Sequence, residues 1–198
     1  MEANSIAVAV GERHTCALSR KQGLWCWGSN HWGQTGHMAA RYLRVPQQVD
    51  ALRSRTKSVA AGYQHTCTAT TVGEVLCWGR NNAGQVGVAG TLPKKAPVSV
   101  GQKVHGAVAV TAGNEHSCSL TKAGKVWCWG RGRLGLLHGK PRANDLGPSA
   151  VDIPAESIVA VSAGDWHTCA LSSSSEVWCW GGNFADGEGD PATVRRVE

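Results

Sequence analysis

The sequence lacks the features that would mark a membrane-spanning protein or a familiar class of enzyme. No stretch approaches the roughly 20 consecutive apolar residues that a membrane-spanning helix needs. The opening residues, 1–4, lack the charged and apolar regions of a signal peptide. The chain has no P-loop signature, no nucleophile elbow and no carboxylate pair that stands apart from the rest. We therefore expect no membrane span, no catalytic residue and no cofactor.

Aromatic residues other than tryptophan are also scarce. The 198 residues include one phenylalanine and two tyrosines, against nine tryptophans and 25 glycines. Many glycines indicate many tight turns, and a large indole that recurs among them indicates one repeated packing element. This composition is typical of an all-β protein.

Two motifs recur at a constant interval of 51 residues. His-x-Cys begins at His14, His65, His116 and His167. Cys-Trp-Gly begins at Cys26, Cys77, Cys128 and Cys179. The chain is therefore one supersecondary unit repeated four times, over approximately residues 5–50, 51–101, 102–152 and 153–198 of a single repeat domain, 1–198. No sequence remains for a separate catalytic domain.

Each repeat contains four short segments with strand character. In the first repeat these are residues 6–10, 14–18, 24–27 and 45–49, separated by glycine or polar turns. The last segment has a Pro-x-x-Val pattern, which begins in successive repeats at Pro46, Pro97, Pro148 and Pro191. We predict an all-β fold, a β-propeller built from four 51-residue antiparallel blades.

The final Pro-x-x-Val segment, residues 191–194, indicates how such a ring could close. We expect this C-terminal strand to pair beside residues 6–10, because an open propeller leaves strand edges unpaired. Two alternatives stay open. One is a ring of eight blades shared by two chains, and the other is an open arc completed by another protein.

The chain resembles the regulator of chromosome condensation repeat family over nearly its whole length, most closely in the first two repeats. The family pattern joins Gly-x-x-His-Thr to a later Trp-Gly-x-Asn-x-x-Gly-Gln-x-Gly, and the first repeat carries it at Gly11, His14, Thr15, Trp27, Gly28, Asn30, Gly33, Gln34 and Gly36. The later repeats depart from the pattern, with Gly132 and Leu136 in the third and Ala185-Asp186-Gly187 in the fourth. The resemblance implies a propeller, in its familiar form a ring of seven blades, whose function lies in the loops where the repeats differ.

Each repeat holds two cysteines ten residues apart. If the hairpin between them folds about residue 21 in the first repeat, the two face each other across an antiparallel ladder, within disulfide reach. We favour four disulfides, which join Cys16 to Cys26, Cys67 to Cys77, Cys118 to Cys128, and Cys169 to Cys179. Four pairs of reduced, buried thiols are the alternative. The paired cysteines favour an extracellular or other oxidising compartment, although no signal peptide is visible.

The recurrent histidines allow a second interpretation of the cysteines. His14, Cys16 and Cys26 could supply three ligands of a zinc site, but zinc sites usually place cysteines two to four residues apart. We therefore expect no metal. We expect the histidines to hydrogen-bond the backbone near the turn that follows the first strand of each repeat.

The tryptophans divide into a recurrent and a non-recurrent set. The recurrent ones are interpreted as wedges between neighbouring blades, and they are Trp27, Trp78, Trp129 and Trp180. Trp32 and Trp166 do not recur, and we interpret them as exposed aromatics at a partner-binding rim. Residues 164–168 are similar to a segment of the plant UV-B photoreceptor of this family, which implies a minor alternative function. The equivalent positions in the other repeats are not tryptophans but Arg13, Gln64 and Glu115.

The formal charge of +6 is unevenly distributed. Residues 1–50, 51–100, 101–150 and 151–198 carry +2, +5, +5 and −6. The densest basic run lies in the long loop of the third repeat and consists of Arg131, Arg133, Lys140 and Arg142. We predict that this run binds an acidic protein partner or a second copy of the chain, with a merely solvated surface as the alternative. The acidic fourth repeat argues against nucleic acid as the partner.

These features together predict a non-enzymatic protein–protein interaction scaffold, either free-standing or a structural subunit of a larger assembly. No motif identifies the partner. The family resemblance implies an alternative, a guanine-nucleotide exchange factor or chromatin-binding regulator of a small GTPase.

Overall fold

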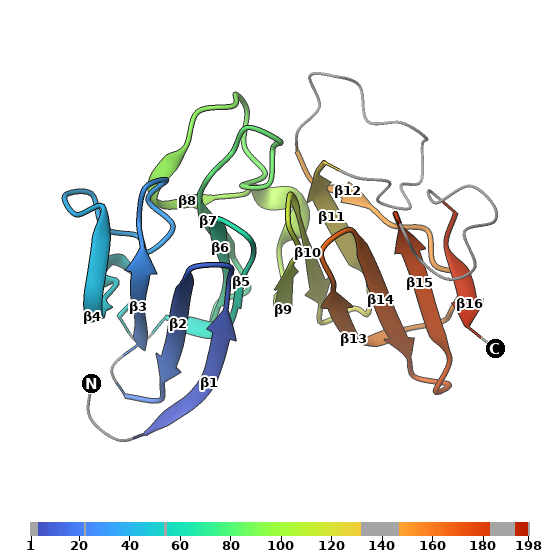
Figure 1. Ribbon diagram of the computed structural model, residues 1–198. Coiled ribbons are helices and arrows are strands. Elements are labelled where there is room, and N and C mark those ends of the chain that lie inside the picture. Colours follow the sequence, from blue (N-terminus) through green and yellow to red (C-terminus); the bar gives the residue numbers. More distant parts are fainter. Residues whose placement is uncertain (1–3, 22, 54, 132–146, 183–192, 198) are drawn as a thin grey trace.

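The structure is a computed structural model that describes residues 4–21, 23–53, 55–131, 147–182 and 193–197. These residues form four antiparallel sheets of four strands each, which lie side by side in chain order (Figure 1). Two short 3₁₀ turns, η1 (Asp50–Leu52) and η2 (Gln102–Val104), are the helical elements of the described part. The predicted all-β propeller of four blades is confirmed.

Each sheet consists of four consecutive strands from one repeat. The first contains β1 (Ser5–Val10), β2 (His14–Ser19), β3 (Gly23–Ser29) and β4 (Tyr42–Gln48). The second contains β5 (Thr56–Ala61), β6 (His65–Thr70), β7 (Val75–Gly79) and β8 (Lys94–Ser99). The third contains β9 (Ala107–Ala112), β10 (His116–Thr121), β11 (Val126–Gly130) and β12 (Ser149–Ala150). The fourth contains β13 (Ile158–Ala163), β14 (His167–Ser172), β15 (Val177–Gly181) and β16 (Arg195–Val197).

The first strands of the four sheets form the inner edge of the row. β1 contacts β5, β5 contacts β9, and β9 contacts β13. The turn after each first strand contains a glycine that has no room for a side chain. At Gly62, an added Cβ would overlap the imidazole ring of His65 and the carbonyl oxygen of Gly113 in the next blade. The Gly-x-x-His spacing therefore lets the ring fold back over its own turn while the next blade approaches closely.

The expected pairing of the N- and C-terminal strands is wrong, because among the described strands each terminal strand pairs within its own repeat. β16 pairs with β15, with Arg195 opposite Cys179 and Val197 opposite Val177. β1 pairs with β2, and β4 already completes the first sheet beside β3. The first sheet therefore has all four of its strands without a contribution from the C-terminus. The first and last sheets lie at opposite ends of the row (Figure 1).

The hydrophobic core lies in the junctions between consecutive sheets. Each junction receives one tryptophan from the third strand of the following blade: Trp78 in the first, Trp129 in the second and Trp180 in the third. All three indoles are at most 1% exposed. The interpretation of these residues as wedges is confirmed, whereas Trp27, which has no preceding blade in this chain, is only half-buried.

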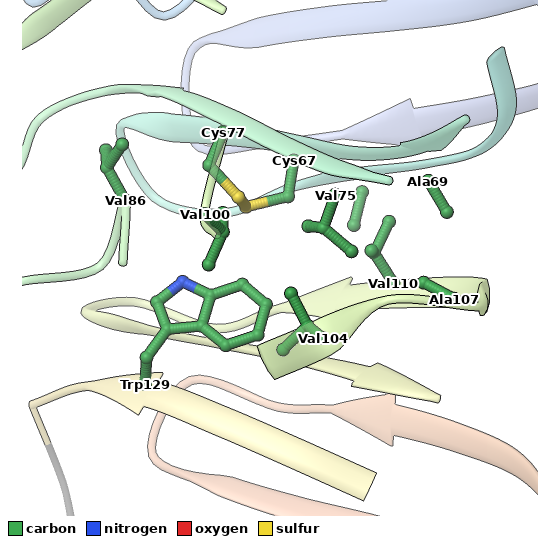
Figure 2. Close-up of a cluster of buried hydrophobic side chains, with 11 residues drawn as sticks. Cys67, Ala69, Val75, Cys77, Val86, Val100, Val104, Ala107, Val110 and Trp129 are labelled. Carbon is green, nitrogen blue, oxygen red and sulfur yellow. A yellow bond between two sulfur atoms is a disulfide. The ribbon is translucent and has the colours of Figure 1, made fainter. Parts of the chain in front are cut away.

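Figure 2 shows the second junction in detail. The indole of Trp129 lies against Val100 and Val104, close to the disulfide that joins Cys67 and Cys77. The structure forms the same bond in every repeat, with a Cα–Cα distance of 4.1 Å in each pair. Each blade therefore offers the following tryptophan a surface of aliphatic side chains and sulfur.

Candidate functional site

The turns and long loops at one end of the blades form a continuous surface, which we call the loop face. It consists of the turns 11–13, 62–64, 113–115 and 164–166 and the loops 30–41 and 80–93. These segments lie at the top of Figure 1, opposite the hairpins that join the second and third strands. Loops on a rigid β-scaffold are the usual place for recognition residues.

A hollow of about 420 Å³ opens among the four turns. All four blades line it, largely with glycine, alanine and valine residues. Its polar side chains are Glu12, Tyr63 and Asp165, which occupy the same position in the first, second and fourth repeats. The hollow therefore carries acidic groups at its two ends, within a protein whose net charge is +6.

Arg80 connects three blades beside this hollow. Its guanidinium group donates a hydrogen bond to Gln64 at 3.1 Å and lies 3.8 Å from the carboxylate of Glu115. The same guanidinium group lies over the ring of Trp32, 5.5 Å from the ring centroid, in a cation–π arrangement. Trp32 comes from the first blade, Arg80 and Gln64 from the second, and Glu115 from the third. This contact holds an exposed aromatic ring in a fixed position.

The polar network continues on both sides of Arg80. Gln64 donates to Glu12 at 3.3 Å, and Glu12 forms an ion pair with Arg13 at 3.0 Å. On the other side Glu115 pairs with Arg131 at 3.3 Å. The side chain of Glu115 is 11% exposed, whereas that of Arg131 is 71% exposed. Because most of the Arg131 side chain is exposed, it stays accessible to a partner although it pairs with Glu115.

Buried amides hold the long loops in shape. In the second repeat Asn81 donates to the Gly90 carbonyl at 2.7 Å and accepts from the Val86 amide at 3.0 Å, while Gln85 accepts from the Ala83 amide at 2.9 Å. Asn30 and Gln34 make the equivalent contacts in the first repeat. These are the asparagine and glutamine of the family pattern.

We expect Asn81→Ala to lower the free energy of unfolding by about 1–3 kcal/mol, because two buried backbone groups would lose their partner. Chemical denaturation would measure the loss. Asn82→Ala, a change of the same kind on an exposed neighbour, is the control. Equal effects of the two substitutions would contradict the role of Asn81.

Hydrogen bonds join the first three recurrent histidines to the following blade. The Nε2 atom of His65 lies 2.8 Å from the Ser117 hydroxyl, which donates to the Gln85 carbonyl at 2.9 Å. The indole of Trp129 donates to the same carbonyl at 2.9 Å. Because the hydroxyl already donates to Gln85, it must accept from His65, so Nε2 carries the proton of the neutral ring. The expectation that the histidines bond the backbone of their own turn is corrected for His14, His65 and His116, each of which bonds a hydroxyl in the next blade.

The first junction repeats this arrangement, and the third repeats its contact between histidine and hydroxyl. His14 lies 2.8 Å from Thr66, and His116 lies 2.9 Å from Thr168. Thr66 donates to the Gln34 carbonyl at 2.7 Å. Burial is the largest cause that lowers the pKa of these rings, from 6.5 to about 4 for His14 and His116 and to about 3 for His65. The histidines therefore serve the junctions in their neutral form.

The zinc hypothesis is wrong for the first repeat, because the sulfur atoms of Cys16 and Cys26 are bonded to each other and His14 bonds Thr66. Within the described ranges, no group of three His, Cys, Asp or Glu side chains could hold a metal ion. In the same part of the chain, no helix is both long and apolar enough to cross a membrane.

The structure places three of the six predicted partner-binding residues. Trp32 and Trp166, 38% and 42% exposed, and Arg131 lie on the loop face. Arg133, Lys140 and Arg142 lie outside the described residues. Arg80 and Glu115 were not predicted as site residues. The sequence does contain a signal for Arg80, because Arg80 and Arg131 occupy the same position in successive repeats.

Fold and loop face together define the chain as a repeat domain of the β-propeller class. Two family models, both described as Regulator of chromosome condensation (RCC1) repeat, match it. One covers residues 6–34, 57–85, 107–135 and 158–187, and the other covers residues 22–69, 72–120 and 123–171. The chain belongs to the RCC1 repeat family.

Curated relatives share this region with the chain but are longer. The E3 ubiquitin-protein ligase HERC2 of Homo sapiens is 31% identical over 201 residues, which cover 98% of this chain and 4% of HERC2. The secretion-regulating guanine nucleotide exchange factor of Bos taurus is 35% identical over 187 residues, covering 88% of this chain and 40% of that protein. The chain therefore spans less than half the length of either relative.

Solved structures show the same fold. Human WBSCR16 superposes with a TM-score of 0.82 at 19% identity, over 98% of this chain and 52% of that one. Prp20p from Saccharomyces cerevisiae superposes with a TM-score of 0.81 at 22% identity, over 100% of this chain and 51% of that one. The four blades thus correspond to about half of each of these chains.

Proposed function

We propose that the chain is a non-enzymatic protein-interaction domain that holds an acidic partner on its loop face. The observation that carries this proposal is the network centred on Arg80, which connects three blades and fixes the ring of Trp32 at the surface. Tryptophan and arginine are the side chains most enriched at the energetic centres of protein interfaces. No catalytic set accompanies them among the described residues of the loop face.

Charge supports an acidic partner. Residues 51–150, which make up most of the second and third repeats, carry a net +10, and the exposed guanidinium group of Arg131 belongs to this part of the chain. A partner carboxylate could bind Arg131 without breaking its pair with Glu115, because a guanidinium group has five N–H donors. Yeast RCC1 (Prp20) has been solved in complex with Kap60, and Prp20p from Saccharomyces cerevisiae binds Gsp1p and histones, so propellers of this fold do bind proteins.

The test is affinity capture with the purified chain as bait, followed by quantitative mass spectrometry. We expect one protein to be enriched by the native chain, and its recovery to fall at least tenfold with the double variant Trp32→Ala, Arg131→Glu. Lys122→Glu, a charge reversal on an exposed residue at the opposite end of the blades, is the matched control and should leave recovery unchanged.

Equal recovery by all three baits would contradict the proposed face. A captured small GTPase whose bound nucleotide is released faster in the presence of the chain would favour the exchange-factor alternative. Exchange activity can be distinguished from simple binding, because nucleotide release is measured on the purified chain mixed with the purified GTPase.

A further inference from the structure

The three inner junctions share one construction with two complementary sides. The leading side, on the following blade, presents a valine of the first strand, the junction hydroxyl and the wedge tryptophan; in the second blade these are Val59, Thr66 and Trp78. The trailing side, on the preceding blade, presents the histidine, a residue late in the second strand and one early in the third. Each side is incomplete without the other.

The first blade has a leading side that no preceding blade covers. Val8, at the position of Val59 and Val110, is 66% exposed, whereas Val110 is 7% exposed. Thr15 and Trp27 are half-buried, although the hydroxyl residues and tryptophans at their positions in the other three blades are at most 1% exposed. No hydrogen bond of the Thr15 hydroxyl occurs within the described part of the chain.

The fourth blade has a trailing side that no following blade covers. Leu171 and Val177 are each 38% exposed, whereas their equivalents in the first blade, Leu18 and Leu24, are 2% and 0% exposed. The ring of His167 is half-buried and, among the described residues, makes no hydrogen bond. The acceptor that this ring would need is a hydroxyl placed as Thr15 is placed.

We propose that two copies of the chain join head to tail, with the trailing side of the fourth blade of one copy against the leading side of the first blade of the other. His167 of each copy then donates to Thr15 of the other copy, and Trp27 inserts beside Leu171 and Val177. Two such junctions close a ring of eight blades, a number within the known range for propellers. The interface continues the junction already formed three times within each copy.

Charge favours a second copy as the occupant. The last 48 residues carry −6 and the first 50 carry +2, so a head-to-tail contact places opposite charges side by side. A contact between two fourth blades would instead place −6 against −6.

Sedimentation velocity and native mass spectrometry of the 198-residue chain test the proposal. The native chain should have twice the 20.9 kDa mass of one copy. Val8→Asp on the leading side and Leu171→Asp on the trailing side should each give a single copy. Val72→Asp, at a 63% exposed valine in a hairpin away from both sides, should remain two copies. Ser162→Arg, at an exposed residue of β13, is a second trailing-side variant in case Leu171→Asp lowers the melting temperature.

Mixing the two variants gives the decisive result. In the mixture one junction combines the two intact sides, so Val8→Asp and Leu171→Asp chains should form a mixed two-copy species, with a larger dissociation constant than the native ring because one junction replaces two. A native chain that stays a single copy at every concentration overturns the proposal. So does a two-copy species that survives Val8→Asp, or a pair of variants that fail to associate when mixed. Neither variant alters the loop face, so these outcomes are independent of partner binding.

Discussion

Complete reduction of the four disulfides should lower the melting temperature by roughly 15–30 °C. Each bond closes a loop of about ten residues and contributes about 2–3 kcal/mol by the loop-entropy model. Four bonds together approach the roughly 5–15 kcal/mol that stabilises a whole domain. Since all eight cysteines are paired and seven of them are at most 2% exposed, reduction has to be carried out in denaturant before refolding. Scanning calorimetry of the reduced and oxidised chains measures the difference.

A single-pair variant separates this effect from general damage. The double variant Cys16→Ala, Cys26→Ala should show about a quarter of the fall in melting temperature that complete reduction causes. Its six remaining cysteines should not be modified by iodoacetamide under denaturing, non-reducing conditions. Eight modified cysteines in the unreduced native chain, or an unchanged melting temperature after verified reduction, would contradict the disulfide framework.

Acidification should destabilise the protein steeply between pH 6.5 and about 4. In the unfolded chain a histidine binds a proton near pH 6.5, whereas burial keeps His14 and His116 neutral to about pH 4 and His65 to about pH 3 in the fold. The unfolded state therefore binds more protons in this window, and the free energy of unfolding falls as the pH falls. Well above pH 6.5 the histidines are neutral in both states, so this destabilisation is absent there. The three buried histidines together lower the free energy of unfolding by about 4 kcal/mol for each pH unit below about 6.

Urea denaturation at pH 7.5, 6.0, 5.5 and 5.0 measures this slope. His65→Gln keeps a side-chain donor but removes one titrating group, so about one third of the slope should disappear. Leu24→Ala, a core substitution without a titrating group, should lower stability by about 2–5 kcal/mol at every pH and leave the slope unchanged. If His65→Gln has the native slope, the acid sensitivity has another origin.

The 51-residue period was sufficient to predict the sheets, the disulfide partners and the wedge tryptophans. Each of these features depends on the spacing within one repeat or on a position that recurs in every repeat. Both kinds of information can be read from a single sequence. Closure was not predictable in the same way. The Pro-x-x-Val pattern identifies a strand but not the edge that it joins, and nothing in the pattern distinguishes β15 from β1 as the neighbour.

Contacts between repeats were harder to predict than contacts within them. Arg80 and Glu115 are 35 residues apart and meet because two blades lie side by side, so neither residue type nor local spacing points to the pair. The partner of the histidines was visible in principle. A hydroxyl follows every recurrent histidine, at Thr15, Thr66, Ser117 and Thr168, and a hydrogen bond that spans 52 residues is one repeat plus one position.

The carbonyl that receives two hydrogen bonds in each of the first two junctions belongs to the main chain. Ser117 and Trp129 bind the backbone oxygen of residue 85, and Thr66 and Trp78 bind that of residue 34. A main-chain oxygen is present whatever side chain the loop carries. Mutation can therefore change the exposed residues of a recognition loop over evolutionary time without removing the acceptor that joins the blades, so new binding specificities need not be accompanied by a new fold.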